Sequence, residues 1–140
     1  MVERRAYVDV NVFVYWLAAH PKFGATALKW IKSIEQASSQ TYITSSLTIY
    51  EVLIIVAGLS GKNLKDKNFI ENVVSSITGL RGLYIQPLTK EDAVSATNLM
   101  RKYGLCYEDS LHLASALRAN AEIIISNDRD FDRTLISRVF

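Results

Sequence analysis

The sequence predicts an α/β protein with three layers, in which helices cover both faces of a central parallel sheet of four to five strands. Short apolar runs alternate with longer segments whose apolar residues recur at helical spacing, and the connections between them are short. Strands and helices that alternate in this way form parallel sheets, because each crossover helix packs on a face of the sheet. The 140 residues, 49% of them apolar, are enough for a single domain spanning residues 1–140.

The expected elements can be placed along the chain. Four apolar segments are predicted as strands, at residues 6–8, 41–44, 83–85 and 121–125. Helices are predicted at residues 12–19, 23–38, 47–57, around 69–77, 90–103 and 107–118. Asn11 is expected to cap the first of these helices. Thr89 and Asp92 predict a capping box at residue 90, and Gly104 is expected to end that helix. A polar loop is predicted from Gly58 to Lys67.

Composition excludes some classes of protein. Sixteen Lys and Arg residues against fourteen Asp and Glu give a net charge of +2, which is too close to neutral to indicate nucleic-acid binding by itself. The one cysteine, Cys106, cannot form an internal disulfide, which favours a reducing compartment. The longest apolar run, residues 12–19, is shorter than the roughly 18 residues of a membrane span, and the first residues lack a signal-peptide pattern. We therefore expect a cytoplasmic protein without a membrane segment.

Four carboxylate residues stand at positions where they can converge. Asp9 and Asp128 follow the first and the last predicted strand, and parallel strands place their C-terminal ends at one edge of a sheet. Glu51 lies in the second turn of a helix that is otherwise apolar. Asp109 lies in the first turn of its helix, on the side of Leu113. A carboxylate on an apolar helix face is costly to bury unless it is paired or binds a cation.

A divalent cation bound by these carboxylates would offset the free-energy cost of burying them. Two carboxylates about 4 Å apart repel each other by about 4 kcal/mol at an effective dielectric constant of about 20. Without a cation, such groups hold protons rather than ionise. A set of oxygen ligands without converging Cys or His side chains suits Mg²⁺ or Mn²⁺ rather than Zn²⁺.

Each carboxylate also has a purely structural explanation. Asp9 and Asp128 are suited to capping a helix or forming a turn, and Glu51 to facing solvent. Asp109 is placed to complement the dipole of its helix. Asp130 fits a turn or capping role better than a ligand role, although it is a candidate for an auxiliary role at the site. The metal hypothesis therefore rests on the four residues taken together.

Four segments of the chain resemble the PIN domain, the metal-dependent nuclease fold of bacterial and archaeal VapC toxins. They read YVDVNV at residues 7–12, TIYEV at 48–52, EDSLHLASA at 108–116 and SNDRDF at 126–131. Their order and spacing fit that family from about residue 4 to residue 135. One departure is Val10, where such proteins often carry Thr or Ser. It removes a hydroxyl near the metal and leaves every carboxylate in place.

The resemblance implies a catalytic metal site that holds Mg²⁺ or Mn²⁺. Asp9 and Asp109 are the expected metal ligands. Glu51 and Asp128 are expected to complete the site, directly or through water.

Neighbouring polar residues are expected to support this site. Ser126 and Asn127 are expected to bond a metal-bound water or the Asp side chains, and Asn11 to position Asp9. Asp130 is a further helper. His112 lies one turn after the Asp109 position and is expected to be a packing histidine with a satisfied ring nitrogen, outside the chemistry.

By the same resemblance, the protein is expected to be an endoribonuclease and the toxin of a VapBC-type toxin–antitoxin pair. RNA is the expected substrate, a cognate antitoxin the expected partner, and a homodimer the expected assembly. Lys62, Lys65 and Lys67, together with Arg129 and Arg133 beside the acidic turn, are candidates to hold phosphates. The three lysines equally fit a solvated loop.

Three other functions are alternatives to this one. The first is a catalytically silent PIN-like module that binds RNA or protein, which would be expected to lose one or more of the acidic residues. The second is a phosphatase of the haloacid-dehalogenase type, which requires a second Asp two residues after the first. That position is Asn11, which cannot act as an acid or base. The third is a receiver-type phosphoacceptor, which requires an acidic pair after the first strand and a Lys at the end of a late strand. The chain has neither.

Overall fold

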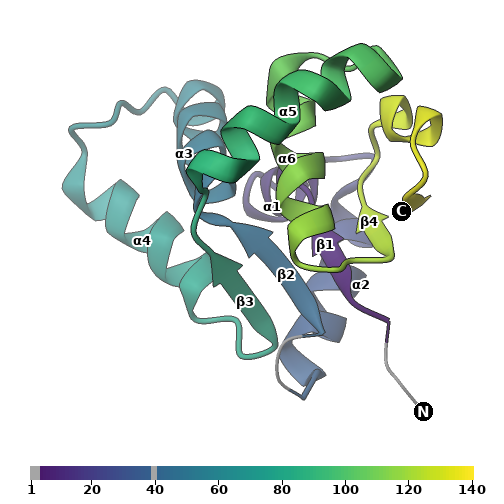
Figure 1. The fold of residues 1–140 in the computed structure, drawn as a ribbon. Helices are drawn as coiled ribbons and strands as arrows, with labels where there is room; N and C mark the ends of the chain where they lie inside the picture. Colours follow the sequence, from purple (N-terminus) through teal and green to yellow (C-terminus); the bar gives the residue numbers. More distant parts are fainter. Residues whose placement is uncertain (1–3, 39–40) are drawn as a thin grey trace.

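The computed structural model describes residues 4–38 and 41–140 and is built around a parallel sheet (Figure 1). Its five strands are β1 (Ala6–Val8), β2 (Tyr42–Ser45), β3 (Leu83–Gln86), β4 (Ile123–Ile125) and β5 (Ser137–Val139). They lie in the order β3-β2-β1-β4-β5, and every neighbouring pair is parallel. The predicted parallel sheet of four to five strands is confirmed. Residues 1–3 and 39–40 of the predicted single domain lie outside the described residues.

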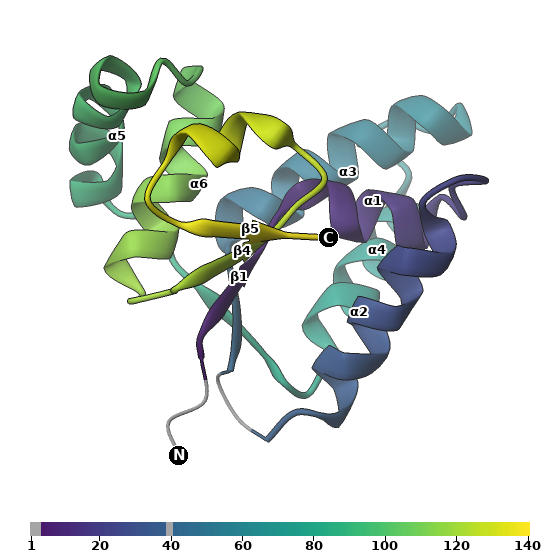
Figure 2. The same cartoon turned by 90° about the vertical axis from the view of Figure 1, so that its right-hand side faces the viewer.

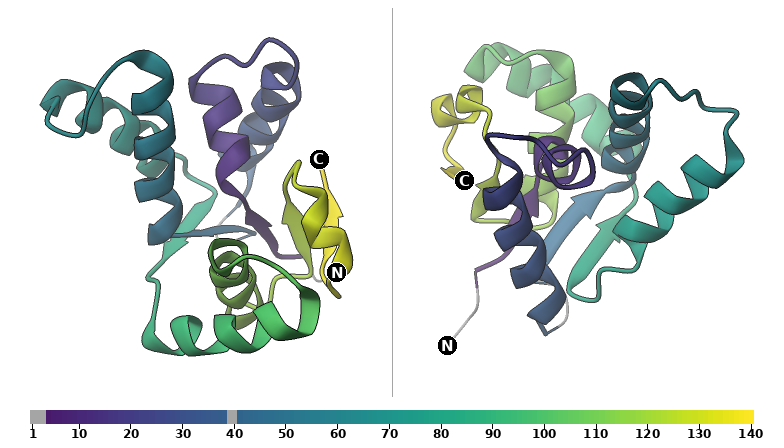
Figure 3. Two further views of the ribbon diagram at one scale, coloured as in Figure 1. Left: turned by 90° about the horizontal axis from the view of Figure 1, so that it is seen from above. Right: turned by 180° about the vertical axis from the view of Figure 1, so that it is seen from behind.

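Six α-helices and one short 3-10 helix pack around this sheet in the described chain. They are α1 (Val10–Leu17), α2 (Gly24–Gln36), α3 (Ser46–Ser60), α4 (Lys67–Thr78), α5 (Lys90–Tyr103), α6 (Tyr107–Arg118) and η1 (Arg129–Arg133). Helices α5 and α6 cover one face of the sheet, and α1 to α4 cover the other (Figures 2 and 3). The predicted three-layer α/β/α architecture is therefore confirmed. Among the described residues, no helix combines the length and the apolar composition needed to cross a membrane.

The central strand β1 separates two hydrophobic clusters. Its side chains alternate between the faces of the sheet, as those of any strand do. Ala6 and Val8 pack with Phe13 and other residues of the α1 to α4 layer. Tyr7 points to the opposite face and packs with Leu113 and other residues on the α6 side. Because both faces are covered, all three residues of β1 are buried, and the strand is a rigid base for the residues that follow it.

Two expectations about element boundaries were wrong, and one strand lies outside the predicted elements. The first helix begins at Val10 and its N-cap residue is Asp9, so Asn11 lies inside the helix and its side chain is free for other bonds. Helix α3 continues to Ser60 and ends at Gly61, whose φ of 66° is in the left-handed region that glycine adopts readily. The predicted loop from Gly58 therefore starts later. Strand β5 was not assigned from the sequence, because it has no apolar run.

The predicted capping box is confirmed. The Asp92 backbone N–H donates to Thr89 Oγ1 at 3.2 Å, and the Thr89 backbone N–H donates to Asp92 Oδ2 at 3.1 Å. Gly104 ends the helix with a φ of 68°, as predicted. These bonds fix the start and end of α5, and the turn after Gly104 leads directly into α6.

Gly82 offers a test of how closely α2 approaches the turn before β3. A methyl group at Gly82 would overlap the carbonyl oxygen of Ile34 and lie 2.8 Å from the Cβ of Ala37. Gly82→Ala is therefore expected to lower the free energy of unfolding by about 1 to 3 kcal/mol, because backbone must move. Gly58→Ala is the control, since Gly58 lies in α3 with open space around it. It should raise the free energy of unfolding by about 1 kcal/mol. Urea denaturation measures both changes, and equal stability of Gly82→Ala and the wild type would contradict the packing.

Candidate metal centre

The parallel pairing of β1 with β4 brings Asp9 beside Ser126. Val8 and Ile125 are register partners, and the Asp9 backbone N–H donates to the Ile125 carbonyl at 3.0 Å. The next residue of each strand therefore emerges at the same edge of the sheet. Ser126 Oγ donates to Asp9 Oδ2 at 2.6 Å. Asp9 is 5% exposed, so this bond fixes a buried carboxylate.

Asn11 connects the two strand ends. Its Nδ2 donates to Ser126 Oγ at 3.2 Å and lies 3.5 Å from Asp9 Oδ2. Its Oδ1 accepts from the Asn127 backbone N–H at 3.2 Å. Asn127 Nδ2 in turn donates to the Tyr15 hydroxyl at 3.1 Å. Asn11, Ser126 and Asn127 thus hold Asp9 and the start of the acidic loop in one hydrogen-bond network.

Strand β5 holds the same loop from its other end. Arg138 Nη1 donates to the Ser126 carbonyl at 3.1 Å, and its Nε and Nη2 donate to the two carboxylate oxygens of Asp132 at 2.8 and 3.2 Å. The Ser126 backbone N–H also donates to the Val139 carbonyl at 2.9 Å. The acidic loop is therefore clamped between two neighbouring strands.

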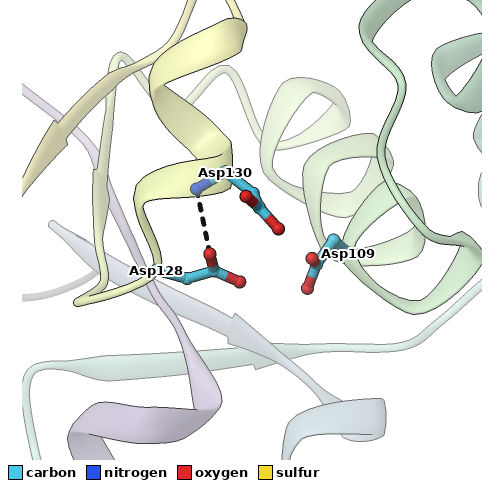
Figure 4. Close-up of side chains that lie close together, drawn as sticks. All are labelled: Asp109, Asp128 and Asp130. Atoms are coloured by element: carbon cyan, nitrogen blue, oxygen red, sulfur yellow. Dashed lines mark hydrogen bonds between the residues drawn. The ribbon is translucent and has the colours of Figure 1, made fainter.

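Three carboxylates converge closely at the end of this loop. Each of Asp109, Asp128 and Asp130 offers one oxygen, and these oxygens lie within 4.8 Å of one another (Figure 4). Asp128 Oδ1 accepts from the Asp130 backbone N–H at 2.9 Å, so Asp128 also caps η1. Its other oxygen points towards Asp109 (Figure 4). Asp128 can therefore cap η1 and belong to the acidic cluster at the same time.

Glu51 approaches from α3 on the other side. Its Oε1 lies 2.7 Å from His112 Nε2, and His112 Nδ1 lies 2.8 Å from the Tyr7 hydroxyl. His112 is 1% exposed, so the expected packing histidine with a satisfied ring nitrogen is confirmed. Neither Glu51 nor Asp9 belongs to the close group of three Asp residues found in the described chain.

All four predicted carboxylates nevertheless line one pocket of about 320 Å³. Its wall includes Asp9, Glu51, Asp109 and Asp128, together with Asn11 and His112. It also includes Glu108, which the sequence analysis did not single out. The sequence contains one indication of this position. Glu108 and His112 are four residues apart, which puts both side chains on one face of α6.

The acidic groups of the pocket have altered pKa values, partly because they lie close to one another. Burial, with Asp128 and Asp9 nearby, raises the pKa of Asp109 to about 6. Contact with Glu51, together with burial, raises the pKa of Glu108 to about 7. Burial also acts to raise the pKa of Glu51, but hydrogen bonds with His112 and Glu108 outweigh it and lower that pKa. Of these two glutamates, Glu108 is therefore the one that stays protonated up to about pH 7 and is ionised above it.

His112 carries the positive counterpart of these charges. Burial acts to lower its pKa, but the Tyr7 oxygen and the carboxylates of Glu51 and Asp9 raise that pKa well above the usual range for histidine. A protonated imidazole donates from Nε2 to Glu51 Oε1. Both ring nitrogens are then occupied, and neither is free to bind a metal.

The donor set fits a hard divalent cation. Carboxylate oxygens within 4.8 Å of one another can share one ion, whose oxygen ligands lie at about 2.0 to 2.6 Å. Burial, followed by the nearby charges of Asp128 and Asp9, raises the pKa of Asp109, and a bound cation would offset both effects. The groups available to an ion are oxygen atoms, which excludes the nitrogen and sulfur ligands typical of zinc sites.

Fold and site define an α/β protein with a carboxylate cluster at the C-terminal edge of a parallel sheet. A family model for the PIN domain matches residues 6–135. The chain therefore belongs to the PIN domain family, which confirms the resemblance seen in its four segments. PIN nucleases generally use divalent metal ions, and this chain has an acidic cluster that could hold one.

Solved structures share this fold along nearly the whole chain. VapC20 of Mycobacterium tuberculosis, described as a toxin that cleaves the sarcin–ricin loop, has a TM-score of 0.72 at 13% identity, over 91% of this chain and 92% of that one. VapBC2 of Rickettsia felis, bound to promoter DNA, has a TM-score of 0.67 at 17% identity, over 96% of each chain. A toxin–antitoxin complex of Klebsiella pneumoniae has a TM-score of 0.65 at 20% identity, over 96% of each chain. No curated protein matches the sequence at a significant level.

Asp109→Asn is expected to stabilise the metal-free protein. Since the pKa of Asp109 is raised from 3.8 to about 6, ionisation above that pH costs stability in the folded state. About 2 pKa units correspond to about 3 kcal/mol, and solvent screening reduces the expected gain to about 1 to 2 kcal/mol. Thermal unfolding in EDTA at pH 7.5 measures it. The gain should disappear below about pH 4, where Asp109 is protonated anyway. A variant that melts at or below the wild-type temperature at pH 7.5 would contradict the repulsion.

Proposed function

We propose that this protein is a Mg²⁺- or Mn²⁺-dependent endoribonuclease that acts as the toxin of a VapBC-type toxin–antitoxin pair in the cytoplasm. The observation that carries the proposal is the convergence of Asp9, Glu51, Asp109 and Asp128 on one pocket of a PIN domain. The VapC toxins among the structural neighbours support the choice of RNA as substrate. The free Cys106, which is exposed, suits a reducing compartment.

The chain's own residues would divide the work at this site. Asp109 and Asp128, with Asp9, would hold the ion, Glu51 would complete its surroundings, and Asp130 would help from the loop. When bound, the ion would lower the pKa of a water and neutralise charge that develops on the phosphate.

Orientation and proton transfer fall to neighbouring residues. Ser126 and Asn11 keep Asp9 in one orientation through their hydrogen bonds. Glu108, with a pKa of about 7, is suited to accept a proton from the attacking water near neutral pH.

Arginines near η1 are better placed than the lysines to hold the RNA backbone. Arg133 Nη2 lies 3.4 Å from Asp130 Oδ1, which puts its guanidinium beside the acidic cluster. Arg129 starts the same short helix. The loop between α3 and α4, which carries Lys62 and Lys65, lies on the far side of the molecule from η1 in two views (Figures 1 and 3). We therefore assign the phosphate contacts nearest the cleavage point to Arg129 and Arg133.

A catalytically silent binding module is the remaining alternative. Membership of the PIN domain family leaves the phosphatase of the haloacid-dehalogenase type without support. A silent module would have no need of carboxylates that raise one another's pKa, because such repulsion costs stability. The presence of all four carboxylates at one pocket therefore favours an enzyme over a silent binding module.

Cleavage of end-labelled single-stranded RNA by the purified protein with Mg²⁺ or Mn²⁺ tests the activity. EDTA is expected to abolish cleavage, and Asp109→Asn to reduce it by at least about 100-fold, because an ion ligand is lost. Glu122→Gln is the matched control, since Glu122 is exposed and lies just before β4, at the opposite end of that strand from the cluster. It should cleave like the wild type.

Two results would count against the proposal. Equal cleavage by Asp109→Asn and the wild type would identify a contaminating nuclease. Absence of cleavage in every sample, together with an unchanged melting temperature in Mn²⁺, would favour the silent module. An ion at about 100 times its dissociation constant should add about 2.7 kcal/mol to the free energy of unfolding.

The toxin role includes an antitoxin and a homodimer. Several structural neighbours are toxin–antitoxin complexes, which supports an antitoxin partner. Helix α3 offers an interface for the second copy. Besides Ile55, which lines the acidic pocket, this helix exposes three large apolar residues, Tyr50 (56% exposed), Ile54 (45%) and Leu59 (65%). Exposed apolar residues gathered on one helix are typical of protein–protein contacts.

Ile54→Glu tests the homodimer. The wild type is expected to have the mass of two chains in solution, and Ile54→Glu the mass of one, because a buried charge without a partner would disrupt the interface. Light scattering after size-exclusion chromatography measures the mass. Val94→Glu is the control, because Val94 is also apolar and 60% exposed but lies on α5. A monomeric wild type, or a dimeric Ile54→Glu variant, would contradict the prediction.

A further inference from the structure

A buried chain of polar side chains connects the central strand to the acidic pocket. It runs from the Tyr7 hydroxyl to His112 Nδ1 over 2.8 Å, and from His112 Nε2 to Glu51 Oε1 over 2.7 Å. Tyr7 is fully buried and His112 is 1% exposed. The three residues come from β1, α6 and α3, which are distant in the sequence. Glu51 is the point where this chain of bonds reaches the pocket.

We propose that His112 is a positioning residue, which fixes the Glu51 carboxylate at the wall of the acidic pocket by anchoring it to Tyr7. This inference rests on the proposed function and deepens it. The bond to His112 occupies Oε1 of Glu51, so Oε2 is the oxygen left for a cation or for Glu108. The expectation that His112 lies outside the chemistry changes with this contact, because Tyr7 and Glu51 are both distant from His112 in the sequence.

Glu51 depends on this anchor because α3 offers it little else. The helix is apolar on nearly every side, and Glu51 has three rotatable side-chain bonds. Among the described residues, its only other side-chain hydrogen-bond partner is Glu108, another carboxylate. Without His112, the carboxylate would be repelled by the other acidic groups and would occupy several rotamers. An ion ligand with several rotamers binds more weakly, because binding must first order it.

The imidazole is itself held rigidly. Tyr7 pairs with Ile43 of β2 on one side and with Ile124 of β4 on the other, in the middle of the sheet. The rings of Tyr7 and His112 lie edge to face, with centroids 5.8 Å apart and planes at 60°. The position of Glu51 is therefore tied, through His112, to the centre of the sheet as well as to α3.

Ser115 provides a matched control in the same helix. It is fully buried, and its Oγ accepts a hydrogen bond from Gln86 Nε2 at 2.6 Å. Ser115→Ala therefore also removes a buried hydrogen bond from α6. Ser115 does not line the acidic pocket. A general loss of stability would appear in both variants, but a loss of positioning would appear only at His112.

The experiment measures Mn²⁺ binding by calorimetry, RNA cleavage and the melting temperature for the wild type, His112→Leu, His112→Gln and Ser115→Ala. His112→Leu is expected to weaken Mn²⁺ binding by about 10- to 100-fold and to lower kcat with little change in KM for RNA. His112→Gln keeps an N–H donor towards Glu51 and should recover most of that loss. Ser115→Ala should lower the melting temperature while keeping the wild-type affinity for Mn²⁺.

A double variant isolates the route through Glu51. If His112 acts by holding Glu51, His112→Leu should cause no further loss of Mn²⁺ affinity in a Glu51→Gln background. Losses that add in the double variant would overturn the proposal. So would wild-type affinity in His112→Leu, or equal losses of affinity in His112→Leu and Ser115→Ala.

The two proposals fail in different ways. A wild type that binds Mn²⁺ but does not cleave RNA would refute the ribonuclease, while the binding measurements would still decide the role of His112. A wild type that cleaves RNA, with His112→Leu equal to it in every measurement, would refute the positioning role alone. A wild type that does not bind Mn²⁺ would refute both.

Discussion

The register between β1 and β4 is the constraint on which the acidic pocket depends. Asp9 meets Ser126 because Val8 and Ile125 are partners in the sheet. A shift of one residue would turn every side chain of a strand to the other face. Tyr7 would then leave the cluster that it shares with Leu113, and its hydroxyl would no longer reach His112. The same pairing therefore aligns the hydrophobic core, Asp9 and, through Tyr7, Glu51.

The protein stabilises three of the carboxylates at the acidic pocket by giving each of the three a neutral or positive hydrogen-bond donor. Asp9 accepts from Ser126, Asp128 from the backbone N–H of Asp130, and Glu51 from His112. These donors come from rigid places, at the ends of strands, in a capped turn and in a buried helix. Repulsion is thus kept in the folded state instead of being relieved by rotation of the side chains. Carboxylates with pKa values perturbed in this way are common at functional sites.

Much of the fold could be predicted from sequence because its signals are local. Apolar runs identified four strands, and Thr89, Asp92 and Gly104 marked the ends of α5 through bonds between near neighbours. Strand β5 could not be predicted from the sequence, because Ser137–Val139 has no apolar run. Its conformation depends on its pairing with β4. Asn11 was assigned a capping role, but contacts with Ser126 and Asn127 draw its side chain elsewhere. The convergence of the carboxylates could be expected from the strand order. The bonds of His112 to Tyr7 of β1 and to Glu51 of α3 could not, because they depend on how α6 packs against the sheet and against α3.

The clamp formed by Arg138 affects the order in which the site can be completed. A chain that has left the ribosome only as far as residue 136 already carries every carboxylate of the pocket. It lacks the bonds from Arg138 to Ser126 and Asp132, and it lacks the pairing of β5 with β4. The acidic loop would then be tethered at one end only. Completion of the acidic pocket therefore depends on β5, and a chain emerging from the ribosome can hold the loop at both ends only after Arg138 has been added.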